Sequence, residues 1–228
     1  MNAIIVCGGL STRLGDITKS TPKILLEIKG KSVLEWQLEK LKAVGARAVV
    51  LAAGHLAEVL HKRVGLNFAG VDIQFAIEDE RLGTGGAIKH AWQYLENQAE
   101  PVIVLNGDIL TGVNLADMMG FVRPLSDGSI LGVEVPDASS YGTLEFDEKY
   151  HLKIFKEKAG KHERGFINGG IYIFNAAARQ YFPAEKSFSL EYDIFPKMRE
   201  LYVYTSSHPW VDIGVPERLE WARQHWVS

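Results

Sequence analysis

Residues 3–14 read AIIVCGGLSTRL, an apolar run that ends in a glycine pair, two hydroxyl residues and an arginine. The run over residues 3–7 is nearly continuous, as in a strand that is covered on both faces of a parallel sheet. The glycine pair lets the backbone approach a ligand closely, and the hydroxyls and guanidinium behind it have the composition of an anion-binding loop. Ligands of open α/β sheets bind at the carboxyl ends of the strands, so this loop is a candidate binding site.

Short β-branched runs alternate with longer amphipathic segments along the first 135 residues. The expected strands cover residues 3–7, 48–52, 71–77, 102–105 and 130–135. The expected helices cover residues 32–44, 55–64, 84–95 and 115–122. Such an alternation is typical of strands that lie parallel and are joined by helices. We therefore predict an α/β fold with a Rossmann-like, mostly parallel central sheet flanked by helices.

From about residue 136 the pattern changes to short strand-like pieces separated by turns and charges. These pieces lie at residues 141–146, 152–155 and 170–174, and we expect them to form a small β-rich lobe. A helix near residues 189–201, a strand near 202–205 and a last helix over 216–226 are expected to follow. A chain of 228 residues is enough for one sizeable core, so we expect a single domain over 1–228 with parts 1–135 and 136–228 and no appended module.

The composition excludes several classes of protein. With 46% hydrophobic and 23% charged residues the chain resembles ordinary globular proteins rather than disordered or fibrous ones. The net charge of -3 gives no support to a nucleic-acid or anionic-membrane surface. The opening apolar run is too short for a signal peptide or a membrane span, and the single cysteine fits a reducing compartment, so a cytoplasmic location is expected. We interpret Cys7 as a small buried residue that ends a strand rather than as a nucleophile.

A second cation, Lys23, follows the glycine loop. Pro22 stiffens the chain that presents Lys23, so Arg13 and Lys23 flank one loop, although a solvated surface loop is the alternative. Two better-known phosphate motifs are absent. The glycines do not have the Gly-x-Gly-x-x-Gly spacing of a dinucleotide fingerprint. Residues 30–32, GKS, lack the glycine that a P-loop needs at position 25, so we predict that they form a turn into a helix.

A second glycine cluster lies at residues 82–89, LGTGGAIK, at the start of a predicted helix. Free amides at a helix N-terminus favour an anion or a polar ring edge, which makes Gly83 and Thr84 candidate ligand contacts. Glu78 ends the preceding strand and is either a ligand contact or a solvated acid.

Two aspartates next to apolar stretches of the sequence are candidate metal ligands. Asp108 follows an apolar strand in LNGD, and Asp212 stands in WVDIG. Oxygen ligands next to a phosphate-binding loop suit Mg²⁺, whereas either acid alone could be a helix cap or a hydrogen-bonded core residue. The histidines have no HxxH or HExxH spacing, so a zinc site is not expected.

Polar residues in the second part of the chain have the composition of a sugar-phosphate pocket. Sugars need paired donors and acceptors, and lysine binds phosphate as a point charge. The candidate segments are residues 155–158, FKEK, and 168–172, NGGIY, together with residues 141–143, YGT. A solvated hairpin is the alternative.

Together these motifs resemble the sugar-1-phosphate nucleotidyltransferase family over nearly the whole chain and in the right order. The family's loop, Gly-Gly-x-Gly-Thr-Arg-Leu followed by Pro-Lys, is similar to residues 8–14 and 22–23. Ser11 stands where glycine is commonest, and Ala159 stands where the family often has proline after Glu-Lys. The resemblance implies the nucleotide-diphospho-sugar transferase fold, with the nucleotide bound by residues 1–135 and the sugar phosphate by 136–228.

The resemblance also assigns functional residues. The implied nucleotide-binding residues are Gly8, Gly9, Ser11, Thr12, Arg13, Lys23, Glu78, Gly83 and Thr84. The implied sugar-phosphate-binding residues are Gly142, Glu157, Lys158, Asn168 and Tyr172. Arg13, Lys23 and Asp108 would be catalytic, and Asp108 with Asp212 would hold Mg²⁺.

Within the family, residues 82–88, 106–108, 141–143, 167–172 and 212–217 look most like D-glycero-D-manno-heptose 1-phosphate guanylyltransferases. Guanine presents two adjacent donors, which suits an acceptor-only carboxylate such as Glu78. The predicted reaction joins GTP and this heptose 1-phosphate to give a nucleotide sugar and pyrophosphate. The alternatives are a uridylyl-, thymidylyl- or cytidylyltransferase for another sugar 1-phosphate, a nonenzymatic nucleotide-sugar sensor and, least favoured, a nicotinamide-dependent oxidoreductase.

Overall fold

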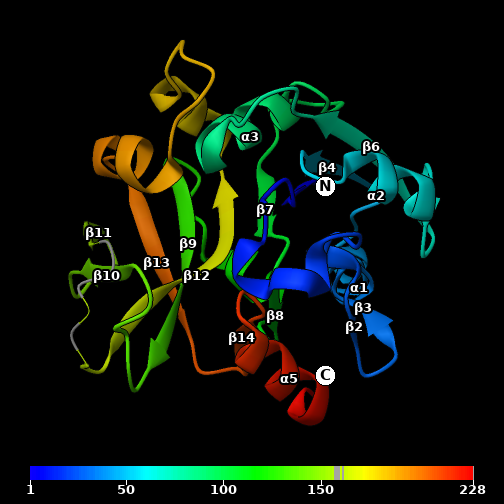
Figure 1. Cartoon of the computed structure of the whole chain (residues 1–228). Coiled ribbons are helices and arrows are strands. Elements are labelled where there is room, and N and C mark those ends of the chain that lie inside the picture. The colour runs from blue at the N-terminus through cyan, green and yellow to red at the C-terminus, as the bar shows by residue number, and fades with distance from the viewer. Residues whose placement is uncertain (157–159, 161, 228) are drawn as a thin grey trace.

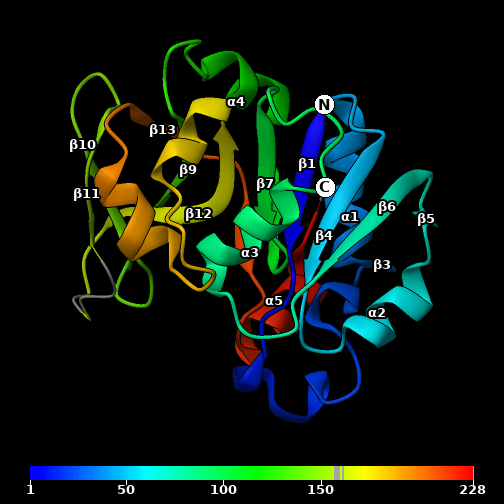
Figure 2. The ribbon, with the colours of Figure 1, turned by 90° about the horizontal axis from the view of Figure 1, so that it is seen from above.

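Ten strands of the described chain form one sheet, and helices cover both of its faces (Figures 1 and 2). The structure is a computed structural model that describes residues 1–156, 160 and 162–227. The parallel centre of the sheet consists, in spatial order, of β7 (Val102–Asn106), β1 (Asn2–Val6), β4 (Ala48–Ala53) and β6 (Val71–Ile77). The short strand β5 (Asn67–Phe68) pairs antiparallel with β6 at one edge. The predicted α/β fold with a mostly parallel central sheet is confirmed.

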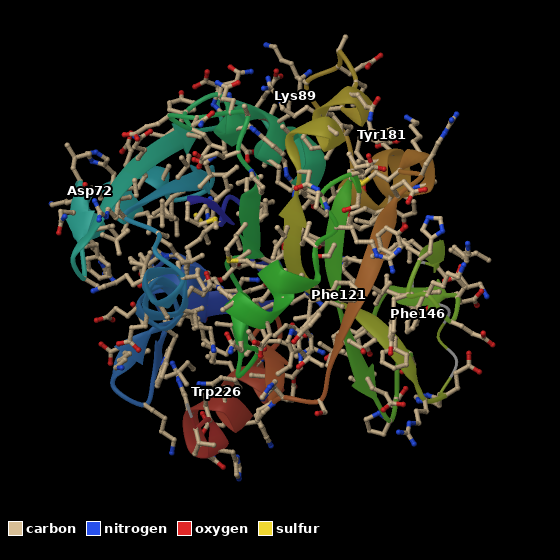
Figure 3. All side chains as sticks on the ribbon, turned by 180° about the vertical axis from the view of Figure 1, so that it is seen from behind. Asp72, Lys89, Phe121, Phe146, Tyr181 and Trp226 are labelled. Carbon is tan, nitrogen blue, oxygen red and sulfur yellow. The ribbon has the colours of Figure 1, made fainter. Side chains whose placement is uncertain are left out.

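Side chains of the central strands alternate between two hydrophobic clusters, one on each face of the sheet. In β1, Ala3 and Ile5 belong to one cluster and Ile4 to the other. The first face is covered by α1 (Val33–Ala43), α2 (Ala57–Val64), α4 (Leu115–Phe121) and α5 (Pro216–His225), and the second by α3 (Gly83–Trp92). Trp226 packs into the first cluster just beyond α5 (Figure 3). Burial on both faces explains why β1, β4 and β7 are almost wholly apolar, whereas β6 has Asp72 on an exposed side.

The order of the parallel strands brings two loops together. The chain passes from β1 outward to β4 and β6, and then returns to place β7 on the other side of β1. Val6 at the end of β1 therefore pairs with Asn106 at the end of β7, and the Gly107 N–H donates to the Val6 carbonyl at 2.8 Å. In α/β proteins ligands bind at the carboxyl ends of the strands, at the point where the strand order along the sheet reverses.

Antiparallel strands extend the sheet beyond β7. The long strand β12 (Gly165–Phe174) pairs with β7 and β9 (Gly128–Val135), and β13 (Leu201–Ser206) lies parallel to β9. The pair β10 (Thr143–Phe146) and β11 (Leu152–Lys156) joins the first half of β12. The predicted β-rich lobe is thus continuous with the main sheet. Pairing of β9 with β12 is irregular between Asn168 and Tyr172, and such irregularities turn side chains toward binding sites.

A separate two-stranded sheet connects the two parts of the chain. In it β8 (Ile109–Thr111) pairs antiparallel with β14 (Trp210–Asp212). Just beyond the ladder the Ile213 N–H donates to the Asp108 carbonyl at 2.9 Å. This pairing brings Asp212 beside Asp108, which is 104 residues earlier in the chain.

The prediction of a helix over residues 189–201 is wrong. The segment forms a single π-helical turn, Leu190–Ile194, and a 3-10 turn, Phe195–Lys197, before β13 begins. Pro196 has no N–H to donate, so an α-helix cannot continue through it without losing a hydrogen bond. Further 3-10 helices lie at Thr12–Thr18, Lys23–Leu25 and Ala176–Tyr181.

The GKS segment forms a turn that leads into a helix, as predicted. It belongs to a short hairpin of β2 (Glu27–Ile28) and β3 (Lys31–Ser32) that the sequence did not reveal. The Ser32 hydroxyl accepts from the Glu35 N–H at 3.2 Å, and the Glu35 carboxylate accepts from the Ser32 N–H at 2.7 Å. These reciprocal bonds form a capping box at the start of α1.

Candidate functional site

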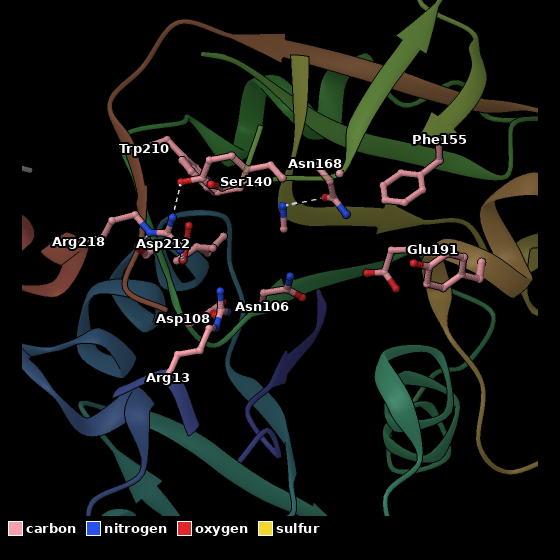
Figure 4. Close-up of a pocket in the computed structure, with 15 residues that line it drawn as sticks. Arg13, Asn106, Asp108, Ser140, Phe155, Asn168, Glu191, Trp210, Asp212 and Arg218 are labelled. Atoms are coloured by element: carbon pink, nitrogen blue, oxygen red, sulfur yellow. Dashed lines mark hydrogen bonds and ion pairs between the residues drawn. The ribbon is translucent and has the colours of Figure 1, made fainter. Parts of the chain in front are cut away.

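Two neighbouring cavities lie at the carboxyl ends of β1 and β7 and share Asn106 and Asp108. The first, here the loop cavity, is also lined by residues of the glycine loop and by cation and hydroxyl groups: Gly9, Ser11, Lys23 and Thr84. The second, here the lobe cavity, is also lined by Arg13, Tyr141, Gly142, Asn168, Asp212 and Arg218 (Figure 4). Most of the residues singled out in the sequence therefore converge on one place.

The glycine loop is shaped by two local constraints. A Cβ at Gly8 would lie 3.0 Å from the Gly54 nitrogen and 3.1 Å from a Glu78 carboxylate oxygen, so a side chain there would push its neighbours apart. Ser11 has φ 54° and ψ 30°, the left-handed conformation that glycine adopts most easily. Serine adopts this left-handed conformation at a conformational cost, because its Cβ crowds the backbone there.

Lys23 and Asp108 form an ion pair inside the loop cavity. The Lys23 ammonium lies 2.7 Å from Asp108 Oδ2, and the two side chains are only 18% and 25% exposed. Pro22, with φ -53° and ψ 135°, presents Lys23 at the start of a 3-10 turn. An ammonium has three donors, so Lys23 can hold Asp108 and still donate to an anion in the cavity.

Asp212 is held by Arg218 from helix α5. Arg218 Nη2 donates to Asp212 Oδ1 at 2.8 Å, Nε donates to the Asp212 carbonyl at 3.2 Å, and Nη1 donates to the Tyr141 hydroxyl at 3.0 Å. The Gly214 N–H also donates to Asp212 Oδ1 at 2.9 Å. Burial and the nearby Asp212 raise the pKa of Tyr141 to about 12, so this hydroxyl stays neutral.

The two carboxylates fit a hard cation that binds together with an anionic ligand. Asp212 Oδ2 is buried and has no hydrogen-bond partner in the described residues, which leaves one carboxylate oxygen for a cation. No cluster of three or more acidic, histidine or cysteine side chains able to hold a metal lies in the described part of the chain. Mg²⁺ is often held by one or two carboxylates plus substrate phosphates, which matches this arrangement.

Arg13 lies on the other side of Asp212. Its guanidinium Nη2 is 3.0 Å from the position that a Cβ of Gly214 would occupy, so Gly214 leaves room for it. Thr12 next to it is exposed and lines neither cavity.

The second glycine cluster has a packing role that the sequence reasoning missed. Gly83 has φ +70°, and a Cβ there would lie 2.6 Å from the Phe188 carbonyl oxygen. The amides of Gly85 and Gly86 donate to that same carbonyl at 3.1 and 3.3 Å. The expectation of free amides at this helix start is therefore wrong for these two residues, since the 186–190 segment already uses them. Thr84 alone of the cluster lines the loop cavity.

Glu78 lies at the end of β6, beside Gly8, and is half-buried. Its carboxylate accepts from the Leu82 N–H at 3.3 Å. Burial raises the pKa of Glu78 above its usual 4.5, against the lowering effect of this backbone bond. Burial and the Glu78 charge raise the pKa of the Cys7 thiol to about 12, so Cys7 stays protonated and is not an activated nucleophile.

The lobe side of the cavity is formed by Gly142, Phe155 and Asn168 (Figure 4). A Cβ at Gly142 would overlap the Phe155 ring, so a side chain there would force the ring to move. Asn168 Nδ2 donates to the Tyr172 hydroxyl at 2.9 Å, and its Oδ1 accepts from the Gly170 N–H at 2.9 Å. Tyr172 is fully buried and does not line the cavity, so it supports Asn168 instead of facing a ligand as the sequence had indicated. Glu157 and Lys158 lie outside the described residues.

The structure adds residues to the site that the sequence reasoning did not select. Arg218 has no motif of its own, and Asn106 precedes the selected Asp108. Glu191 and Tyr192 line the lobe cavity from the π-helical turn, where a regular helix was expected. Figure 4 shows Asp108 and Arg13 facing Asn168 and Glu191 across this cavity.

The chain matches the family model described as "Nucleotidyl transferase" over residues 2–226. The chain belongs to the nucleotidyl transferase family. Among nucleotidyl transferases, the D-glycero-alpha-D-manno-heptose 1-phosphate guanylyltransferase of Campylobacter jejuni is 36% identical over 95% of this chain and 96% of its own length. The heptose guanylyltransferase of the same name from Aneurinibacillus thermoaerophilus is 34% identical over the full length of both chains. The resemblance to this group is confirmed.

Mannose-specific nucleotidyl transferases are similar to the same degree. The mannose-1-phosphate guanylyltransferase catalytic subunit beta of Drosophila pseudoobscura pseudoobscura is 37% identical over 94% of this chain, which spans 59% of the length of that relative. Among nucleotidyl transferases of known structure, HddC from Yersinia pseudotuberculosis complexed with GMP-PN has a TM-score of 0.85 at 33% identity and 98% coverage of both chains. A putative glucose-1-phosphate thymidylyltransferase from Bacillus anthracis shares the fold, with a TM-score of 0.84 at 19% identity. In the described residues no helix is long and apolar enough to cross a membrane.

Proposed function

We propose that the protein is a sugar-1-phosphate guanylyltransferase that joins GTP and D-glycero-D-manno-heptose 1-phosphate and releases pyrophosphate. The observation that carries the proposal is the meeting of the loop and lobe cavities at Asp108, with Lys23 2.7 Å from its carboxylate. A reaction between two phosphate esters needs two adjacent binding places and cations where they meet. The heptose and mannose guanylyltransferases among its relatives support both the base and the sugar class.

The mechanism follows from charge. A phosphate oxygen of the sugar 1-phosphate attacks the α-phosphorus of GTP, a new P–O bond forms, and the bond between the α-phosphorus and the bridging oxygen breaks. Pyrophosphate leaves with that electron pair. No proton has to be removed, because the attacking oxygen is already ionised. The main obstacle is repulsion between two polyanions, so positioning and charge neutralisation carry the catalysis.

Individual residues have separate roles in this proposal. The backbone of the glycine loop surrounds the triphosphate and contacts it at Gly8, Gly9, Ser11 and Thr12. The charges of Arg13 and Lys23 neutralise the α- and β-phosphates. Asn168 and Gly142 contact the sugar phosphate, together with Glu157 and Lys158. Residues 1–135 bind the nucleotide, which the loop cavity supports because the described residues that line it all belong to this part. Residues 136–228 bind the sugar phosphate in the lobe cavity, which they line together with Arg13, Asn106, Asp108 and Ile109.

Asp108 and Asp212 would hold Mg²⁺. When bound, this cation supplies positive charge to the phosphate oxygens. Asp212 Oδ2 has no hydrogen-bond partner within the described part of the chain, which supports this placement of the cation. Arg218 keeps Asp212 in position through Oδ1 and leaves Oδ2 to the cation.

Glu78 reads the base in this proposal. The ring N1–H and the 2-amino group of guanine are adjacent donors, and an ionised carboxylate accepts from both. Gly83 and Thr84 are the remaining nucleotide contacts in this proposal. The triphosphate substrate and the single cysteine favour a cytoplasmic location.

The test measures pyrophosphate release with Mg²⁺ over four nucleoside triphosphates and a panel of hexose and heptose 1-phosphates. Signal with GTP and the heptose 1-phosphate supports the full proposal. Signal with another pair keeps the reaction but refutes the substrate assignment. If no pair releases pyrophosphate and calorimetry shows tight binding of a nucleotide sugar, the protein is a nonenzymatic sensor instead.

A further inference from the structure

Gln37 is a buried amide on the apolar face of α1. It is 3% exposed, and its helix neighbours Leu34, Leu38 and Leu41 are fully buried. An uncharged polar group in such a place costs free energy unless it is hydrogen-bonded, and Gln37 Oε1 has no hydrogen-bond partner in the described residues. The bonds of the amide nitrogen are therefore what offsets the cost of burying this side chain.

The amide nitrogen of Gln37 bridges both ends of the turn that carries Asp108. Gln37 Nε2 donates to the Asn106 carbonyl at 2.8 Å and to the Ile109 carbonyl at 3.0 Å. Both donors of the NH₂ group are used, one on each side of Asp108. No other side chain of the chain's described part donates to these two carbonyls.

The turn is held by backbone bonds on its other sides. The Gly107 N–H donates to the Val6 carbonyl at 2.8 Å, and the Asp108 carbonyl accepts from the Ile213 N–H at 2.9 Å. A Cβ at Gly107 would lie 2.9 Å from the Val6 carbonyl oxygen, so the turn lies directly against β1. On the side of the turn that faces α1, the two hydrogen bonds from Gln37 hold it.

We infer that Gln37 is a positioning residue for the guanylyl transfer: it holds the 106–109 turn so that the Asp108 carboxylate stays at the junction of the loop and lobe cavities. This inference rests on the proposed function. Gln37 touches no reacting group, and its effect passes through Asp108. Catalysis that depends on alignment of two phosphates is sensitive to small displacements, so loosening this turn should lower kcat rather than substrate binding.

The test uses Gln37→Met, which keeps the length of the side chain but has no donor, and Gln37→Glu, which has no N–H donors. The matched control is Ser32→Ala, which removes the N-terminal cap of the same helix and lowers stability without touching the turn. For each variant kcat, both KM values and the urea midpoint are measured. Amide hydrogen exchange is measured for residues 107–109.

Both Gln37 variants should lose about 10- to 100-fold in kcat, with KM values within about twofold of the unmodified protein. The amides of residues 107–109 should exchange faster in both Gln37 variants. In Ser32→Ala the kcat and the slow exchange of these amides should be unchanged, although its urea midpoint is lower. An unchanged kcat in Gln37→Met, or exchange at 107–109 no faster than in Ser32→Ala, overturns the inference. If the unmodified protein turns over no substrate pair, the proposed function fails, and the exchange data still decide whether Gln37 holds the turn.

Discussion

The ammonium of Lys23 lies 2.7 Å from Asp108 Oδ2, although 85 residues separate the two in the chain. From the sequence, Lys23 was expected at the phosphates and Asp108 at a metal, as independent groups. Their contact joins the two groups in one ion pair that is mostly shielded from water, so the phosphate contact and the metal contact that we propose for them lie at the same place.

Replacing Asp108 with Asn should abolish most turnover. The substitution removes the charge at the junction of the two cavities but keeps the side-chain volume, and single electrostatic groups of this kind are worth at least about 100-fold in kcat. Pyrophosphate release measures the effect, and circular dichroism checks that the fold remains. Asp72→Asn, on the exposed side of β6, is the control and should retain activity. Full activity of Asp108→Asn with Mg²⁺ would remove Asp108 from the mechanism.

Replacing Glu78 with Gln should weaken the preference for GTP. The amide offers one acceptor and one donor in place of two acceptors, so one guanine donor loses its partner. Hydrogen bonds to charged groups contribute about 1.5–3 kcal/mol, which corresponds to about a 10- to 100-fold loss in kcat/KM for GTP. Steady-state kinetics with GTP and UTP measure the change. An unaltered GTP-to-UTP ratio would show that Glu78 does not contact the base.

The same substitution should stabilise the protein at neutral pH. Burial raises the pKa of Glu78 above 4.5 in the folded state, so the folded protein holds this proton more tightly than the unfolded chain does. Stability therefore falls as pH rises from about the unfolded pKa through the folded one, and Glu78→Gln removes this loss. Urea unfolding should give Glu78→Gln the higher free energy at pH 7, with a smaller difference below pH 4.5. A constant difference across this range would contradict the pKa argument.

Ser11→Gly should keep activity and raise stability. Ser11 has φ 54°, and the left-handed conformation costs a residue with a Cβ about 1–2 kcal/mol. Part of the gain is offset because glycine is more flexible when unfolded, so an increase of up to about 1 kcal/mol is expected. Ser11→Ala is the control, because it keeps the Cβ and should bring no gain. Thermal unfolding compares the three proteins, and a destabilised Ser11→Gly would mean that the hydroxyl matters more than the backbone.

The ion pair of Asp212 and Arg218 should show measurable coupling. Their side chains are 13% and 25% exposed, and Nη2 lies 2.8 Å from Oδ1. A double-mutant cycle with Asp212→Asn and Arg218→Met should give about 1–2 kcal/mol of interaction free energy in urea unfolding. Additive effects of the two substitutions would mean that Arg218 does not hold Asp212 in solution.

The local features of the site could be predicted from the sequence. Nearly continuous apolar runs identified β1, β4 and β7, because strands buried on both faces have no polar side, and the apolar residues at alternate positions of VDIQFAI identified β6. The glycine loop and Asp108 could then be identified as site candidates, because each comes just after such a run in the sequence. The turn at Leu190–Ile194 was missed, because its apolar spacing resembles a helix and only Pro196 indicates otherwise.

The sequence by itself determined the α/β class, the glycine loop after β1 and the strand ends that carry Asp108 and Asp212, because residue type and periodicity act over a few neighbouring residues. Only the tertiary structure decided that Lys23 pairs with Asp108, that Arg218 holds Asp212, and that Gln37 supports a turn 69 residues away. These contacts depend on the order of the strands and on which helix covers which face. Local propensity carries no information on distances across the sheet, so the packed core alone brings these groups together.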